Sequence, residues 1–192
     1  MHAFAEPPAH AAWRHCDSRE GFEVLFISPR WRAEGSTSAL DEGVPWAVRY
    51  AIDVSPEWVT RAARVASLTA EVALSADGAG RWTVDGERAP HLDGVLDVDL
   101  ESSAFTNAFP VHRLGLAVGE AADAPAAWVR AETLAVERLE QRYERLDDDD
   151  QGRQRFHYTA GDFESLLVFD ASGFVVDYPG IAKRSGGEPR RS

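Results

Sequence analysis

The chain has 192 residues, of which 44% are hydrophobic and 10% aromatic, so it is long enough for one folded domain with a single core. Its formal net charge of −12 repels phosphate backbones and argues against nucleic acid as a partner. A single cysteine, Cys16, excludes an intramolecular disulfide and a cysteine-based zinc site.

The first residues of the chain do not have the pattern of a signal peptide. Residues 1–10 have neither a basic start nor an apolar run of signal-peptide length, and no later stretch is apolar enough to cross a bilayer. We therefore expect a cytoplasmic protein without a membrane span. Residues 1–10 and the basic tail 185–192 are predicted to be flexible, and residues 11–184 to form one domain.

The first predicted strands lie in the N-terminal half. Residues 21–28 are rich in β-branched and aromatic residues. In residues 45–55 apolar and small or polar residues alternate, which is typical of a half-buried strand. Two Asp-Gly pairs follow, at residues 77–78 and 85–86, and predict hairpins.

In the second half, short strands are predicted at residues 111–118 and 126–132, and a strand–turn–strand unit at residues 163–180. Residues 130–146 are ambiguous, because their residue types favour a helix while Leu139, Gln141 and Tyr143 alternate as in a strand. Many short strands separated by turns predict an all-β, mainly antiparallel single domain, either a sandwich or a barrel-like roll.

A polar stretch at residues 96–116 interrupts this pattern. Asp97 and Asp99 lie on the same face of any strand that contains them. Arg113 lies between apolar neighbours, so its charge must reach water, an anionic ligand or a carboxylate, and Asp97 or Asp99 is the natural partner. Thr106 and Asn107 are residue types that stabilise turns.

Catalytic and metal-binding motifs are not evident in the sequence. It contains no glycine-rich phosphate loop and no nucleophile elbow, and the six histidines show no metal-ligand spacing. We therefore predict neither a metal nor a cofactor. Asp97 and Asp99 could still form an acid and base pair, because two carboxylates on one face can split their pKa values.

Four stretches together resemble a family of small bacterial proteins described as glycolipid-binding. They are RWTVDG (81–86), HLDGVLDVDL (91–100), FTNAFPVHRL (105–114) and FVVDYPG (174–180), and weaker agreement extends the match to residues 13–184. The resemblance implies a spiral β-roll, a curled open barrel with few or short helices, similar to bacterial lipoprotein carriers. It also implies that residues 130–146 are extended. The family usually has two adjacent arginines before the leucine at position 114, and here His112 replaces the first of them. This replacement would weaken the binding of an anionic head group or make that binding pH-dependent.

We therefore predict non-catalytic binding of an amphipathic small molecule, of the glycolipid type, in the concave face of the roll. The candidate apolar wall consists of Trp46, Tyr50, Trp82, Phe105, Phe109 and Tyr143. The candidate polar set consists of Asp97, Asp99, Asn107, His112 and Arg113. Two alternatives stay open: a small hydrolase that uses Asp97 or Asp99 with His112, and a regulatory domain that binds another protein. We expect a monomer or a weak dimer.

Overall fold

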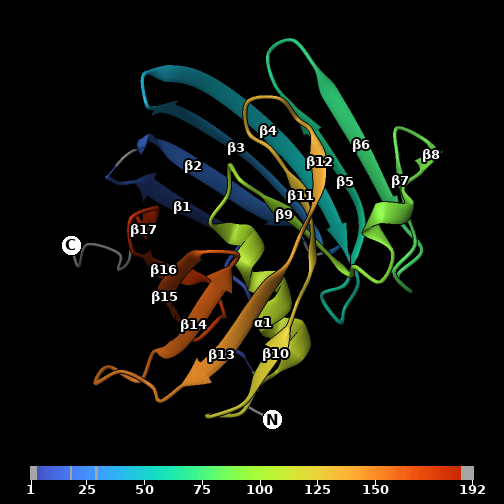
Figure 1. Ribbon diagram of the computed structural model, residues 1–192. Helices are drawn as coiled ribbons and strands as arrows, with labels where there is room; N and C mark the ends of the chain where they lie inside the picture. The colour runs from blue at the N-terminus through green and yellow to red at the C-terminus, as the bar shows by residue number, and fades with distance from the viewer. Residues whose placement is uncertain (1–3, 18, 29, 187–192) are drawn as a thin grey trace.

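The computed structural model describes residues 4–17, 19–28 and 30–186, and its main feature is a 14-stranded open antiparallel sheet (Figure 1). The strand order is β10-β13-β14-β15-β16-β17-β1-β2-β3-β4-β5-β6-β7-β8, so the C-terminal and N-terminal strands join where β17 pairs with β1. In chain order these strands are β1 (His10–His15), β2 (Arg19–Ser28), β3 (Arg32–Asp41), β4 (Val44–Val54), β5 (Thr60–Ala66), β6 (Glu71–Ala76), β7 (Trp82–Val84), β8 (Glu87–Arg88), β10 (Ala121–Asp123), β13 (Gln141–Leu146), β14 (Gln154–Ala160), β15 (Phe163–Phe169), β16 (Val175–Tyr178) and β17 (Ala182–Arg184).

A second, three-stranded sheet and three short helices lie against the first. The small sheet has the order β12-β11-β9, with β9 (Asp97–Leu100) parallel to β11 (Ala126–Val129) and β12 (Val136–Leu139) antiparallel to it. The helices are η1 (Pro90–Leu92), η2 (Phe105–Asn107) and α1 (Ala108–Leu114). None of the helices in the described part of the chain has the length and hydropathy needed to cross a bilayer.

The large sheet curls around η2 and α1, and the core lies between them (Figure 1). On β4 the alternation predicts the buried face correctly, since Val48, Tyr50 and Ile52 are all buried. Phe105 and Phe109 project from η2 and α1 into the same core. The middle of the concave face is therefore filled by side chains of the chain itself.

The structure confirms the all-β fold and two local predictions. Asp85 and Gly86 both have positive φ, 51° and 84°, as the tight turn between β7 and β8 requires. Of residues 130–146, for which the resemblance implied extended structure, residues 136–139 and 141–146 form β12 and β13, so the helix propensity is overridden there, whereas residues 130–135 form a turn and that part of the prediction is wrong. Burial explains the outcome, because Gln141, Tyr143 and Arg145 alternate into the interior of the sheet.

The predicted strand at residues 111–118 is wrong, because residues 108–114 form α1. Pro110 is compatible with a helix here, since the first turn contains N–H groups that have no intrahelical partner. Gly115 ends the helix with a φ of 56°, a left-handed conformation that glycine adopts easily. The helix is short, and its buried residues pack into the core, so tertiary contacts decide its formation.

Candidate functional site

An ion pair joins α1 to β9 in the polar stretch. Arg113 Nε donates to Asp97 Oδ1 at 3.0 Å, and Arg113 Nη2 donates to Asp97 Oδ2 at 2.5 Å. Asp97 is 1% exposed, and its burial raises the pKa of the carboxyl while Arg113 opposes that shift. The predicted pairing of Arg113 with one of the two aspartates is confirmed. Among the described residues, Arg113 Nη1 makes no hydrogen bond.

Asp99 is in a different environment from Asp97. The Thr106 hydroxyl donates to Asp99 Oδ1 at 2.6 Å, but no cationic side chain among the described residues forms an ion pair with this carboxylate. Burial raises the pKa of Asp99 to about 6, and repulsion from Asp97 and Glu101 adds to the shift.

His112 is held as a neutral imidazole on α1. Its Nε2 donates to the Ser172 carbonyl at 2.9 Å, so its Nδ1 is the acceptor. The ring stacks on Trp58, with centroids 3.8 Å apart and planes 9° apart, and Phe4 lies 4.1 Å away. Burial lowers the pKa of His112 to about 4, so the ring is uncharged at neutral pH.

Two adjoining cavities form what we call the Trp groove. They have volumes of about 370 and 540 Å³ and share Glu6, Pro7, Trp31 and Trp58. The first cavity is apolar and lies at one end of strands β2–β4, and the second ends at polar groups of α1. Apart from the shared four, the first is lined by Ala9, Ile27, Ser28, Ala33, Val54 and Phe105, and the second by Phe4, Ala5, His112, Arg113, Leu114 and Gly115.

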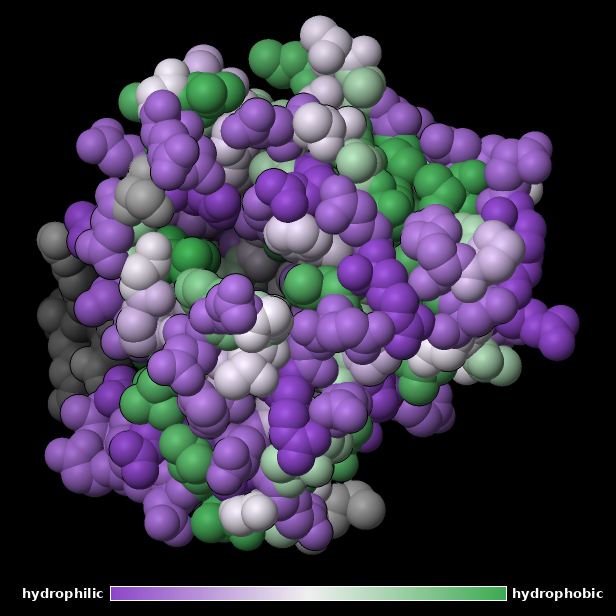
Figure 2. Space-filling model, viewed as in Figure 1, coloured by the Kyte–Doolittle hydropathy of each residue, from purple (hydrophilic) through white to green (hydrophobic). Residues whose placement is uncertain are grey.

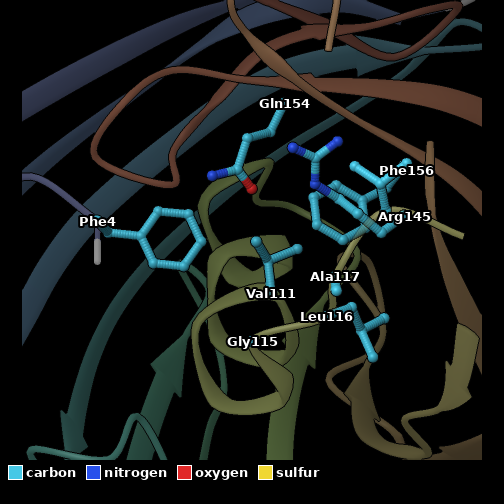
Figure 3. Close-up of a pocket in the computed structure, with 9 residues that line it drawn as sticks. Phe4, Val111, Gly115, Leu116, Ala117, Arg145, Gln154 and Phe156 are labelled. Atoms are coloured by element: carbon cyan, nitrogen blue, oxygen red, sulfur yellow. The ribbon is translucent and has the colours of Figure 1, made fainter. Parts of the chain in front are cut away.

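A smaller cavity of about 270 Å³ lies beyond Phe4, at the C-terminal end of α1. Figure 3 shows Phe4, Gln154, Arg145 and Phe156 arranged around Val111 of the helix. The Arg145 guanidinium is paired with Asp148 and lies 5.4 Å from the Phe156 ring centroid. Phe4 borders both this cavity and the Trp groove, so the N-terminal segment forms a shared wall.

A third cavity, which we call the Tyr cleft, has a volume of about 320 Å³. It lies at the opposite end of β2 from the Trp groove, because Arg19 begins that strand whereas Ile27 and Ser28 end it. Figure 2 shows a hollow on this side of the molecule, near the segment that follows β9. The cleft is lined by Arg19, Asp99, Leu100, Glu101, Ser103, Asn107, Trp128, Leu139, Tyr158, Ala160, Phe163, Tyr178 and Ile181.

The predicted polar set is therefore divided between two cavities. His112 and Arg113 line the Trp groove, Asp99 and Asn107 line the Tyr cleft, and Asp97 lines none of these cavities. The hydrolase alternative required Asp97 or Asp99 to converge with His112. The geometry does not support it, because Asp97 is locked to Arg113, and Asp99 and His112 line separate cavities.

The predicted aromatic wall lies mostly in the core. Tyr50, Trp82, Phe109 and Tyr143 are buried, and of the six residues only Phe105 lines one of the cavities described here. The sixth, Trp46, is partly buried below the guanidinium of Arg19, 5.1 Å from it. Asn107 accepts a hydrogen bond from the Tyr143 hydroxyl at 2.9 Å through its Oδ1, so it also anchors the core.

Sequence reasoning missed the two tryptophans that shape the Trp groove. Trp31 and Trp58 have φ values of 59° and 62°, a left-handed conformation that is unfavourable for large side chains. Their indoles meet edge to face, with centroids 5.7 Å apart. The sequence contained only an indirect indication of their role, because both tryptophans lie outside the alternating runs from which the strands were predicted.

Sequence reasoning also missed a buried carboxyl, Glu23. Its side chain is 0% exposed and accepts hydrogen bonds from the Tyr50 hydroxyl at 2.6 Å, the Ser103 hydroxyl and the Ala104 amide at 2.8 Å. Burial raises the pKa of Glu23 to about 7. Its position in the sequence could have indicated its burial, because Glu23 lies two residues before the buried Leu25 and therefore on the same face of β2.

Comparisons with known proteins give a consistent result. The chain matches a family model with the description "Putative glycolipid-binding" over residues 10–184. It is also similar to a crystal structure of a DUF1089 family protein from Pseudomonas aeruginosa, with 36% sequence identity and a TM-score of 0.76. That similarity covers 90% of this chain and 95% of the other. No curated protein matches this chain.

Proposed function

This chain belongs to the family described as "Putative glycolipid-binding", and from that premise we propose that it binds an amphipathic molecule of the glycolipid type in the Trp groove, without chemical turnover. Both cavities of the groove are lined mainly by apolar groups; Glu6 lines both, and at α1 the lining adds the polar side chains of His112 and Arg113, so an amphipathic ligand would find room for both of its parts. Its apolar part would lie at one end of strands β2–β4, and its head group at α1.

The apolar end suits an alkyl chain. Ile27, Ala33, Val54 and Phe105 line it, and Trp31 and Trp58 separate it from the polar end. Removing each methylene of a chain from water contributes about 0.8 kcal/mol. A chain of several carbons would therefore supply most of the affinity, and the head group would supply orientation.

The polar end suits a neutral head group that carries hydroxyls. Arg113 is neutralised by Asp97 but keeps a donor at Nη1, and the neutral His112 ring has its acceptor at Nδ1. A sugar hydroxyl can both accept and donate a hydrogen bond, so it could use the donor at Arg113 Nη1 and the acceptor at His112 Nδ1. A phosphate offers acceptors only and would meet no uncompensated cation at these two residues. This distinction favours a glycolipid over a phospholipid.

The observation that carries the proposal is the backbone strain at Trp31 and Trp58. Large residues held at φ values of 59° and 62° persist only where the surrounding structure enforces them, and such strain clusters at ligand-binding sites. Both strained residues line both parts of the same groove.

Isothermal titration with octyl glucoside, octyl phosphate and glucose, each below any micellar concentration, tests the proposal. We expect octyl glucoside to bind most tightly and glucose to bind weakly, because the chain supplies the affinity. Trp31→Ala should weaken octyl glucoside binding by about tenfold or more, since a large apolar contact is lost. Trp128→Ala is the matched control, because Trp128 lines the Tyr cleft.

Equal binding of octyl glucoside by wild type and Trp31→Ala would contradict the groove as the site. Tighter binding of octyl phosphate than of octyl glucoside would contradict the neutral head group. Absence of heat with all three probes, and no rise in thermal stability, would contradict the proposed function itself, because a ligand must stabilise the state that it binds.

A further inference from the structure

The Tyr cleft combines a carboxylate with aromatic rings, and it shares no lining residue with the Trp groove. Tyr158, Phe163 and Tyr178 form a triangle in which ring centroids lie 6.1 Å, 6.1 Å and 6.2 Å apart. Trp128 contributes a fourth aromatic side chain to the lining. Phe163 is 42% exposed, so its ring is accessible at the rim of the cleft.

Among the described charged groups that line the cleft, Asp99 is the one that forms no ion pair, and its hydrogen-bond donor is the neutral Thr106 hydroxyl. Arg19 is fully engaged, because it forms an ion pair with Asp41 at 2.8 Å and donates to the Glu101 carbonyl at 2.8 Å. The Glu101 carboxylate pairs with Arg130 at 3.2 Å. Among the described residues no cation pairs with Asp99, and its Oδ2 makes no hydrogen bond.

From this arrangement we propose that the Tyr cleft binds a small organic cation, an ammonium or methylated ammonium group held by Asp99 and the surrounding aromatic rings. An ammonium group would neutralise the one uncompensated charge in the cleft. Aromatic faces attract cations through their negative π surface, and a carboxylate flanked by such faces is the usual arrangement for methylated ammonium groups. The proposal does not rest on the function assigned to the Trp groove.

A neutral sugar is the competing occupant, since sugars also rest on aromatic rings. The charge arrangement favours the cation. A sugar would leave the Asp99 carboxylate buried and uncompensated, whereas an ammonium group removes that penalty. Burial, and after it the Asp99 charge, raises the pKa values of Tyr158 and Tyr178, so those hydroxyls stay neutral beside the bound ligand.

Binding should depend on pH through Asp99. Its carboxyl, whose pKa is about 6, is faced by Asp97, Glu101 and the hydroxyl of Thr106. The other titratable groups that line the cleft are Tyr158, Tyr178 and Arg19, and burial raises the pKa values of both tyrosines far above neutral pH, so their hydroxyls do not titrate there. Affinity for a cation should therefore fall as the pH drops below about 6, because Asp99 takes up a proton.

The test is calorimetric titration and thermal denaturation of the full chain with tetramethylammonium, choline and glucose at neutral pH. We expect saturable binding of both cations and none of glucose. Asp99→Asn should lower cation affinity by about tenfold or more, because the ion pair is lost. That variant should fold, since its amide oxygen can still accept from Thr106. Asp123→Asn, which removes an equal charge from a surface pair with Arg142, is the control.

A second variant tests the rings independently of the charge. Phe163→Leu keeps an apolar side chain at the rim but removes the π face, and should weaken cation binding by about threefold. Equal cation binding in wild type and Asp99→Asn would overturn the proposal. So would binding of glucose but not of the cations, or no detectable binding of either cation. The test of the Trp groove, which measures octyl glucoside binding by Trp31→Ala, does not affect this result, so each of the two proposals can be contradicted independently of the other.

Discussion

Individual residues in this protein hold unusual backbone conformations or shifted protonation equilibria. Trp31 and Trp58 adopt left-handed backbone conformations, and the buried Glu23 and the partly buried Asp99 have carboxyls with raised pKa values. Each feature carries a free-energy cost that simpler residues would avoid. Their consequences can be measured one residue at a time.

The strain at Trp31 can be separated from its packing by comparing two small substitutions. Trp31→Gly and Trp31→Ala remove the same indole, but only glycine adopts a φ of 59° without strain. We expect the glycine variant to be the more stable by about 1 kcal/mol. Urea denaturation followed by circular dichroism measures the difference. Equal stabilities, or a more stable alanine variant, would mean that the backbone at this position is not strained.

Glu23 should impose a pH dependence on stability. Its pKa is raised from 4.5 to about 7 in the folded chain, so between these values the folded state keeps a proton that the unfolded state has lost. This contribution to the free energy of unfolding therefore falls as the pH rises through that window. Relative to wild type, Glu23→Gln should gain about 2–3 kcal/mol between about pH 4.5 and pH 8.

Urea denaturation of both proteins across this pH range measures the Glu23 effect. Comparison with wild type is the essential control, because His15 and His112 have lowered pKa values and contribute the opposite slope in both proteins. Parallel stability profiles for Glu23→Gln and wild type would show that Glu23 titrates normally in the folded chain.

At the scale of elements, side-chain contacts between segments decide the local structure more than propensity does. Residues 136–146 form strands although their composition favours a helix, because alternate residues enter the interior. Residues 108–114 form a helix although a strand was predicted, because its first turn, residues 108–111, is buried in the core. The strands with clean alternation and the Asp85-Gly86 turn could be predicted, since their signals are local. The two exceptions depend on contacts distant in sequence.

The ion pair between Arg113 and Asp97 should be the main polar attachment of α1 to β9. Arg113→Leu leaves the Asp97 carboxylate buried without a partner, and should cost about 3–5 kcal/mol of unfolding free energy. The double variant Asp97→Leu with Arg113→Leu should cost less than the sum of the two single variants, because no charge is left unpaired. Chemical denaturation of the four proteins gives this coupling. Simple additivity would show that the pair contributes nothing specific to the attachment of the helix.

Gly35 fixes how closely β3 approaches the side chain of Tyr50. A Cβ at this position would lie 2.3 Å from the Tyr50 ring and 2.7 Å from the Val24 carbonyl oxygen. Gly35→Ala should therefore destabilise the protein by about 1–3 kcal/mol through overpacking. The neighbouring exposed Ser36→Ala is the control, with an expected change within about 0.5 kcal/mol. A neutral Gly35→Ala would show that Tyr50 can move away without loss.

At the scale of the whole molecule, the curled sheet and its internal helix leave separate cavities at the two ends of β2. The resemblance to the family predicts the roll, and the polarity of residues 96–116 predicts the pairing of Arg113. The aromatic residues chosen for the cavity wall are mostly core residues, because sequence patterns indicate burial but not which buried surface borders a void. The residues that define the two sites, such as Trp31 and Tyr158, come together only after distant segments pack.

The most direct measurement is photo-crosslinking with an alkyl glucoside that carries a diazirine in its chain, followed by peptide mass spectrometry. If the chain lies in the Trp groove, labelling should concentrate at Ile27, Trp31 and Val54, and excess octyl glucoside should suppress it. Trp31→Ala should lower the labelling, and Trp128→Ala should leave it unchanged. Labelling concentrated at residues 158–178, or scattered labelling that octyl glucoside does not reduce, would contradict the placement of the ligand in this groove.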